Sequence, residues 1–166
     1  FVVFGAPRDA ATVTAAVAVS LAGALLAALS LFSILSRDEG APDAKRAAWF
    51  MLVFPSGFFL AQVYTEGLFL GLALAAMALA RKGRWTTTAL VASLAVLTRA
   101  AGVALVPAIA VAAARTLARE RAQAKAGDAV RGRIDLAKLA GMAEAILVPL
   151  AVFLAWKFSF LGEVMA

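Results

Sequence analysis

The sequence predicts an all-α fold, a polytopic transmembrane helical bundle. Hydrophobic residues make up 64% of the chain, and the mean hydropathy is +0.92. Several apolar runs reach or exceed the length of about 20 residues that a helix needs to cross a bilayer. The breaks between these runs hold most of the basic residues, which is typical of cytoplasmic loops. These three observations argue against a soluble fold.

The composition also limits the chemistry. Cysteine and histidine are absent, so thiol and imidazole catalysis and the usual zinc sites are excluded, and we expect no metal and no cofactor. The net charge of +6 fits contact with anionic membrane lipid better than with nucleic acid, because aromatic residues do not interleave with the most basic segment. The chain starts at Phe1 without a leader, so we expect a piece of a longer protein.

The first predicted helix covers residues 10–36, which carry no charged side chain. Its many alanines, together with Ser20 and Gly23, offer small surfaces for close helix packing. Residues 37–46 carry both signs of charge and a Gly/Pro break. They are therefore predicted to form a polar turn outside the hydrocarbon.

The second apolar run, residues 47–80, is too long for one ordinary crossing. Pro55 and Gly57 interrupt it, and Glu66 places a carboxylate within it. Backbone groups freed by such a break, and a carboxylate in lipid, need partners from protein or water. Two interpretations fit this run: one long kinked helix, or two short helices joined at residues 55–64.

The third run, residues 86–114, is interrupted in the same way at residues 98–102 and Pro107. If both runs fold back as hairpins, all but three of the 16 basic residues fall on one side, which the positive-inside rule makes cytoplasmic. Two single kinked crossings would instead place residues 81–84 on the outer side, so the charge pattern favours hairpins. The three exceptions are Arg8, Arg99 and Lys157.

The hairpin limbs would be about 12 to 17 residues long, or roughly 18 to 25 Å, so their tips would lie short of the outer surface. Trp49 and Trp85 flank basic turns, a position that suits the headgroup interface. Residues 115–140 are rich in Ala, Arg and Lys and are predicted to form a solvated or interfacial cytoplasmic helix. Residues 141–161 form the last predicted crossing, with Lys157 near its outer end.

This topology brings residues 55–66, 98–102 and 162–163 to one depth on the outer side. Arg99 lies in an otherwise apolar stretch, and its guanidinium is shaped to bind a carboxylate or a phosphate through two parallel hydrogen bonds. Two roles are open: a structural ion pair with Glu66 that joins the hairpins, or a ligand contact. Both hold together if Arg99 bridges Glu66 and a ligand phosphate.

An ordered set of motifs carries a family resemblance. The segment FPSGFFLAQVYTEGLFLGLALAAMALARKGRW is followed by TRAAGVALVP, and it resembles the PIG-V-like mannosyltransferases of the GT-C glycosyltransferase superfamily. In that family Phe-Pro-x-x-Phe-Phe, Tyr-Thr/Ser-Glu-Ser-Leu-Phe, a basic turn ending in Arg-Trp and Thr-Arg-x-x-Gly recur in this order. Here they are residues 54–59, 64–69, 81–85 and 98–102, and residues 161–163 are similar to the family's Gly-Asp-Pro element.

The sequence also departs from the family. Gly67 stands where the family usually has serine, and residues 162–163 lack the usual aspartate and proline. The family's catalytic aspartate lies in a large extracytoplasmic loop after its first helix, and no such loop exists in these residues. The catalytic residue is therefore not identified in this chain.

The resemblance implies a GT-C-like membrane portion of an inverting transferase. Such an enzyme moves a sugar, here expected to be mannose, from a polyprenyl- or dolichyl-phosphate donor to a lipid- or protein-linked acceptor on the extracytoplasmic side. The expected setting is a multi-pass protein of a bacterial plasma membrane or the endoplasmic reticulum. The candidate residues for contacting the lipid phosphate or the sugar are Arg99, Glu66, Tyr64, Thr65, Ser56, Thr98 and Glu163.

A second hypothesis belongs to a different class. The chain can be a non-catalytic integral membrane subunit or a lipid-binding domain, which fits the missing catalytic base. In either case its partners are membrane lipid and further helices, from the same protein or from a partner subunit, because short hairpins need neighbours to cover them.

Overall fold

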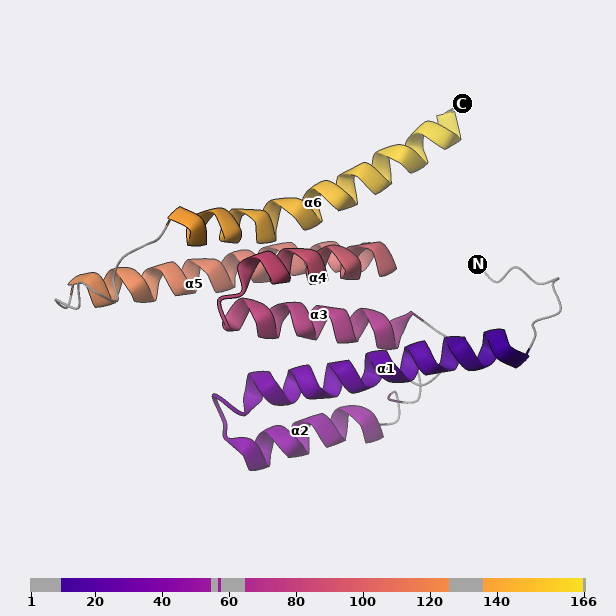
Figure 1. Ribbon diagram of the computed structural model, residues 1–166, viewed down its shortest axis with the longest axis horizontal. Coiled ribbons are helices and arrows are strands. Elements are labelled where there is room, and N and C mark those ends of the chain that lie inside the picture. The colour runs from indigo at the N-terminus through magenta and orange to yellow at the C-terminus, as the bar shows by residue number, and fades with distance from the viewer. Residues whose placement is uncertain (1–9, 55–56, 58–64, 126–135, 166) are drawn as a thin grey trace.

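The computed structural model describes residues 10–54, 57, 65–125 and 136–165, and all regular structure within these ranges is helical. Figure 1 shows the helices in chain order. They are α1 (Ala10–Leu35), α2 (Ala41–Val53), α3 (Glu66–Arg81), α4 (Trp85–Thr98), the short 3₁₀ helix η2 (Ala100–Ala104), α5 (Leu105–Lys125) and α6 (Leu136–Met165).

The helices run up and down along one axis (Figure 1). The turn from α1 to α2, the turn from α3 to α4, the end of α5 and the start of α6 all lie at one end of the bundle. The end of α2, the start of α3 and the break between α4 and α5 lie at the other end. Each of the two interrupted apolar runs therefore goes along the bundle and returns, as the hairpin interpretation predicts. Neither run is a single kinked helix.

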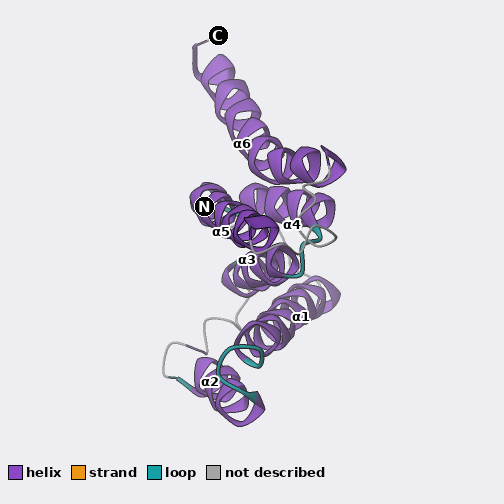
Figure 2. Ribbon diagram, turned by 90° about the vertical axis from the view of Figure 1, so that its left-hand side faces the viewer, coloured by secondary structure: helices purple, strands orange, loops and turns teal. Residues whose placement is uncertain are grey.

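The helices stack as neighbours in the order α2, α1, α3, α4 and α6, with α5 packed against α3 and α6 (Figures 1 and 2). The two limbs around the first break, α2 and α3, are thus separated by α1. By contrast, α3 and α4 pack directly against each other across a three-residue turn. The positive φ of 74° at Gly83 allows that turn to be tight.

Glycines bring α1 and α3 into backbone contact. A Cβ atom added at Gly23 would lie 2.5 Å from the carbonyl carbon of Gly67, and one added at Gly71 would lie 2.4 Å from the carbonyl oxygen of Gly23. Packing without side chains lets membrane helices approach closely. Gly67 and Gly71 therefore form a packing surface, and the backbone of Gly67, where the resembled family has serine, lies against Gly23 of α1.

Helix length separates two kinds of helix. Within the described residues, three apolar helical segments are long enough to cross a membrane: Thr12–Leu35, Ala100–Gln123 and Leu136–Ser159. The others are short, with 13 residues in α2, 16 in α3 and 14 in α4, or about 20 to 24 Å at 1.5 Å per residue. The protein is a multi-pass helical membrane bundle in which three consecutive short helices, α2 to α4, follow the long α1 and precede the long α5 and α6.

The largest core cluster joins α3, α4, α5 and α6, and most of its members are alanines. Trp85 lies inside this cluster with 4% of its surface exposed, and α6 comes so close that a Cβ at Gly141 would lie 3.1 Å from the Cβ of Trp85. Trp85 therefore does not face headgroups as a surface tryptophan would, because α6 packs over it. Trp49 is 66% exposed, as an interfacial tryptophan would be.

The basic segment is divided between two helices. Its first part continues α5 without a break to Lys125, and its last part begins α6 at Leu136. An ion pair between Glu120 and Lys138 joins the two helices there. Pro149 lies within α6 and removes one backbone donor, and the helix bends along its length (Figures 1 and 2).

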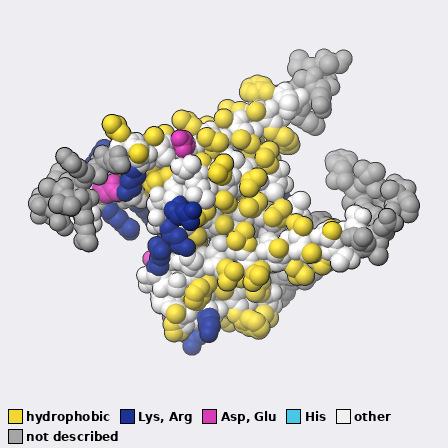
Figure 3. All heavy atoms as spheres, viewed as in Figure 1, with side chains coloured by type: hydrophobic (Ala, Val, Ile, Leu, Met, Phe, Trp, Pro, Cys, Tyr) yellow, Lys and Arg dark blue, Asp and Glu magenta, His cyan; other side chains and the backbone are white. Residues whose placement is uncertain are grey.

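The surface fits a lipid environment at one level and water or headgroups at another. Figure 3 shows hydrophobic side chains over most of the visible face and basic side chains gathered at one end. Exposed leucines are typical of lipid-facing positions. The described leucines that are more than half exposed are Leu25, Leu29, Leu90, Leu94, Leu97, Leu136 and Leu147.

Candidate functional site

Helix α3 begins at the carboxylate of the candidate site. The chain leaves α2 at Phe54, whose ψ of 144° is extended, because the residue before a proline avoids the helical region. Gly57 then donates its N–H to the carbonyl of Phe54 at 2.6 Å, and a Cβ at Gly57 would lie 2.4 Å from the carbonyl oxygen of Leu52. Only glycine fits this turn. Glu66 follows as the first residue of α3, where the helix dipole favours negative charge.

The Thr-Arg-x-x-Gly motif ends α4 and presents Arg99. The Thr98 hydroxyl donates to the carbonyl of Ala95 at 2.7 Å, and Arg99 takes an extended conformation with φ −159° and ψ 133°. Gly102 donates its N–H to the Arg99 carbonyl at 2.8 Å, and a Cβ at Gly102 would lie 2.7 Å from the Cα of Val96. The motif therefore builds a tight reversal between α4 and η2, which holds the backbone of Arg99 in place.

Arg99 and Glu66 form an ion pair at this end of the bundle. Arg99 Nη1 donates to Glu66 Oε1 at 2.7 Å, and the side chains are 47% and 32% exposed, respectively. The second carboxylate oxygen, Oε2, is buried and has no hydrogen-bond partner among the described residues. A guanidinium has five N–H donors, so this contact leaves most of the donors of Arg99 available. The expected pairing of Glu66 with Arg99 is confirmed.

The other predicted residues divide into three groups. Thr98 lies next to Arg99, but its hydroxyl is engaged with its own helix. Thr65 precedes Glu66 and makes no side-chain cap to α3, so its hydroxyl is not used on that helix. Ser56 and Tyr64 lie outside the described residues.

Glu163 is not brought to the ion pair by the path of α6. Its backbone belongs to α6, and the C-terminal part of that helix runs away from the ends of α3 and α4 in two perpendicular views (Figures 1 and 2). Its side chain is outside the described part. The structure therefore assembles two of the three predicted outer pieces, those of Glu66 and Arg99.

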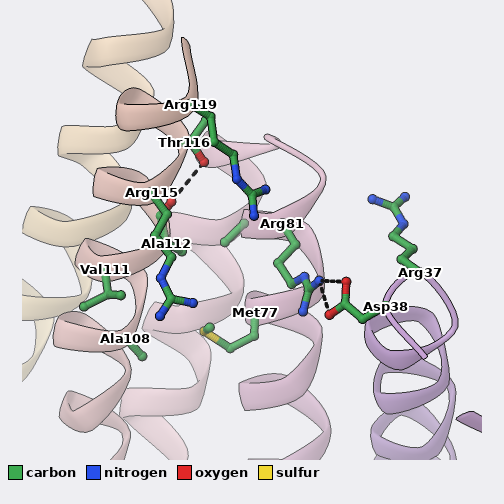
Figure 4. A pocket seen from close by; sticks show the side chains of 11 residues that line it. Arg37, Asp38, Met77, Arg81, Ala108, Val111, Ala112, Arg115, Thr116 and Arg119 are labelled. Carbon is green, nitrogen blue, oxygen red and sulfur yellow. Dashed lines mark hydrogen bonds and ion pairs between the residues drawn. The ribbon is translucent and has the colours of Figure 1, made fainter. Parts of the chain in front are cut away.

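A second group of charges, which the sequence patterns did not single out, lines a cleft at the opposite end. The cleft has a volume of about 790 Å³ and lies between the C-terminal ends of α1 and α3 and the middle of α5 (Figure 4). The spacing of Arg115 and Arg119, one helical turn apart, is the signal that could have indicated it. It is lined by Arg37, Asp38, Met77, Ala80, Arg81, Ala108, Val111, Ala112, Arg115, Thr116 and Arg119.

One carboxylate in this cleft is already neutralised. Arg81 Nη2 donates to both oxygens of Asp38 at 2.6 Å. This hydrogen-bonded guanidinium, assisted by the charges of Arg119 and Arg37, holds the pKa of Asp38 below its ordinary value. No cluster of three or more metal-ligating side chains occurs in the part of the chain that the structure describes.

No protein-family model, curated protein or solved structure matches this chain. The resemblance to PIG-V-like mannosyltransferases therefore stays a prediction from the motifs. What the structure adds is a physical role for two of those motifs, the turn at residue 57 and the reversal at residues 98–102.

Proposed function

We propose that this chain provides the lipid-phosphate site of a membrane glycosyltransferase. The donor is a sugar, with mannose as the expected one, linked to polyprenyl or dolichyl phosphate, and the acceptor is a lipid- or protein-linked hydroxyl on the extracytoplasmic side. The observation that carries this proposal is the half-exposed ion pair between Arg99 and Glu66 at the tips of two short helices.

The chemistry of the transfer asks for a cation at this position. In an inverting transfer the bond between the anomeric carbon and the phosphate oxygen breaks while the acceptor oxygen bonds to the opposite face of the sugar. Negative charge grows on the departing phosphate, and a fixed guanidinium stabilises it. In this proposal Arg99 donates to the phosphate with its remaining N–H groups, and Glu66 positions the guanidinium from α3.

The short helices favour a lipid-borne donor. Helices α3 and α4 have 16 and 14 residues, so their tips would lie below the surface of a hydrocarbon layer about 30 Å thick. A polyprenyl chain can then reach Arg99 sideways from the bilayer. The basic turns at the opposite end would face the cytoplasm under the positive-inside rule.

The general base that takes the proton of the acceptor hydroxyl is assigned to residues beyond those described. Such a base needs a free carboxylate or an equivalent group. The one acidic side chain described at this end, Glu66, is engaged with Arg99. This observation also favours the second candidate, a non-catalytic subunit or lipid-binding domain that contributes the phosphate site to a partner.

Arginine substitutions in the full-length protein test the proposal. Arg99→Ala is expected to lower sugar transfer from a polyprenyl-phosphate donor by about 100-fold or more, as loss of a charge-stabilising donor does in other enzymes. Arg99→Lys should also weaken transfer sharply, because an ammonium cannot hold Glu66 and a phosphate in the same planar geometry. Arg46→Ala, at the opposite end and 74% exposed in its side chain, is the matched control.

The outcomes separate the candidates. Normal expression with unchanged turnover in Arg99→Ala would reject the role of Arg99. A full-length wild-type protein that binds the lipid donor in an Arg99-dependent way but transfers no sugar would instead select the lipid-binding subunit.

A further inference from the structure

The cleft at the basic end has a strong excess of positive charge. Four arginines and one aspartate line it. Both carboxylate oxygens of Asp38 accept hydrogen bonds from Arg81, so this ion pair has no net charge. Among the described residues, Arg37, Arg115 and Arg119 have no hydrogen-bonded or ion-paired carboxylate. Three guanidinium groups are therefore available to an anion.

The geometry concentrates these charges. Arg115 and Arg119 lie one turn apart on the same face of α5. Figure 4 shows Arg119 extending toward Arg81 on α3, while the Arg115 side chain runs along α5 toward the level of Met77. Guanidinium groups bind phosphate oxygens through paired, directional hydrogen bonds. An anion with several oxygens could contact α3 and α5 at once.

The walls of the cleft are apolar on the side that leads toward lipid. Met77, Ala108, Val111 and Ala112 form this part of the lining, and Val111 is 51% exposed. The charged residues Arg115 and Arg119 follow directly along α5, so we expect the boundary between hydrocarbon and headgroups to fall within the cleft. A ligand seated here meets arginines at its head and apolar surface at its tail.

We propose that this cleft binds the phosphate of an anionic membrane lipid from the leaflet at the basic end. The phosphate contacts Arg115 and Arg119, and the first part of an acyl chain lies along Val111 and Met77. A free phosphate compound offers the same oxygens but no tail, so the apolar wall favours the lipid. This site is at the opposite end from Arg99 and does not depend on the proposed transferase activity.

Native mass spectrometry of the full-length protein in detergent, with an anionic phospholipid or a zwitterionic one added, tests the proposal. The wild-type protein is expected to retain the anionic lipid preferentially. The double variant Arg115→Gln/Arg119→Gln should lose at least about tenfold in apparent affinity, since each basic residue near a membrane surface contributes several-fold. The matched control Lys45→Gln/Lys82→Gln removes the same charge from exposed positions outside the cleft and should bind as the wild type does.

Two further measurements sharpen the result. Asp38→Asn releases Arg81 from its carboxylate partner and is expected to tighten anionic lipid binding severalfold. Millimolar glycerol phosphate or inorganic phosphate should displace little of the bound lipid. Equal loss of binding in both double variants, or no preference for anionic lipid, would overturn the proposal. Full displacement by free phosphate would overturn the assignment to lipid and identify a soluble phosphate as the ligand.

Discussion

The two ends of the bundle use arginine in opposite ways. Among the described side chains at one end, a single arginine, Arg99, is matched by a single carboxylate, Glu66. At the other end four arginines share a cleft with one aspartate. A charge set in an apolar stretch must be paired because lipid does not solvate it, whereas charges at the headgroup level are solvated and can stay in excess. The pairing of Arg99 and the excess of arginines in the cleft fit this difference between an apolar stretch and the headgroup level.

Glycines also work differently at the two ends. At the basic end Gly40 and Gly83 have positive φ values of 86° and 74° and serve tight turns. At the ion-paired end Gly57 and Gly102 lie where a Cβ would collide with the backbone of the preceding helix. Gly40 and Gly83 therefore supply a backbone conformation that other residues rarely adopt. Gly57 and Gly102 let the chain pass close to the preceding helix, and this close approach positions the residues around the ion pair.

The largest expected effect concerns the sides of the membrane that the two ends face, which we expect to be opposite. The chain has no cysteine of its own, so single cysteines can report accessibility. Lys82→Cys is suitable at the basic end because Lys82 is exposed and its φ is −82°, while the neighbouring Gly83 has a positive φ that disfavours a side chain.

In intact cells or vesicles, Lys82→Cys should be protected from an impermeant maleimide applied outside. Ala101→Cys, exposed beside Arg99, should react with the maleimide unless lipid covers it. Permeabilisation should expose Lys82→Cys completely, which serves as the control. Labelling of Lys82→Cys from outside would overturn the assignment of the basic turns to the cytoplasm.

The next largest effect is expected where α1 and α3 meet. Gly71→Ala would place a Cβ 2.4 Å from the carbonyl oxygen of Gly23, so the helices must separate. We expect a loss of about 3 kcal/mol in stability, measured by thermal unfolding in detergent. Ala143→Val adds more volume at an exposed position of α6 and should be nearly neutral. Equal stability of the two variants would contradict the backbone contact between α1 and α3.

Much of this fold could be predicted because charge and helix breakers are visible in the sequence. Pro55, Gly57 and the 98–102 motif indicated the two interruptions. The positions of the basic turns favoured hairpins over kinked crossings. The pairing of Glu66 with Arg99 followed from the cost of an unpaired charge in an apolar stretch. The interruptions depend on local sequence, and the ion pair depends on the high free-energy cost of an unpaired charge in an apolar stretch.

The remaining features depend on which helices become neighbours, which the sequence does not state. Trp85 is buried because α6 packs over it through Gly141. The sequence around residue 85 does not predict that contact. The basic cleft likewise combines the end of α1 with α3 and α5. Pro149 indicates a bend in α6, but not the direction in which the bent helix carries Glu163 away from the ion pair.

The smallest expected effect is a change in stability at acidic pH. Arg81 holds the pKa of the exposed Asp38 carboxyl below its ordinary value of 3.8, so the ion pair contributes stability that is present above about pH 4 and is lost as the pH falls through the lowered pKa. Melting temperatures of the wild type and Asp38→Asn should therefore differ slightly at neutral pH and converge in stronger acid. A difference that grows as the pH falls would contradict this sign.

In the proposed function, Arg99 both pairs with Glu66 and binds the donor phosphate. Exchanging the two charges, as Glu66→Arg with Arg99→Glu, separates the two roles in the full-length protein. If the account is right, the exchanged protein regains the melting temperature that either single variant loses, because the ion pair re-forms. Its transfer of sugar from a polyprenyl-phosphate donor stays as low as that of Arg99→Ala. Recovery of wild-type transfer in the exchanged protein would contradict the account and make the pair purely structural.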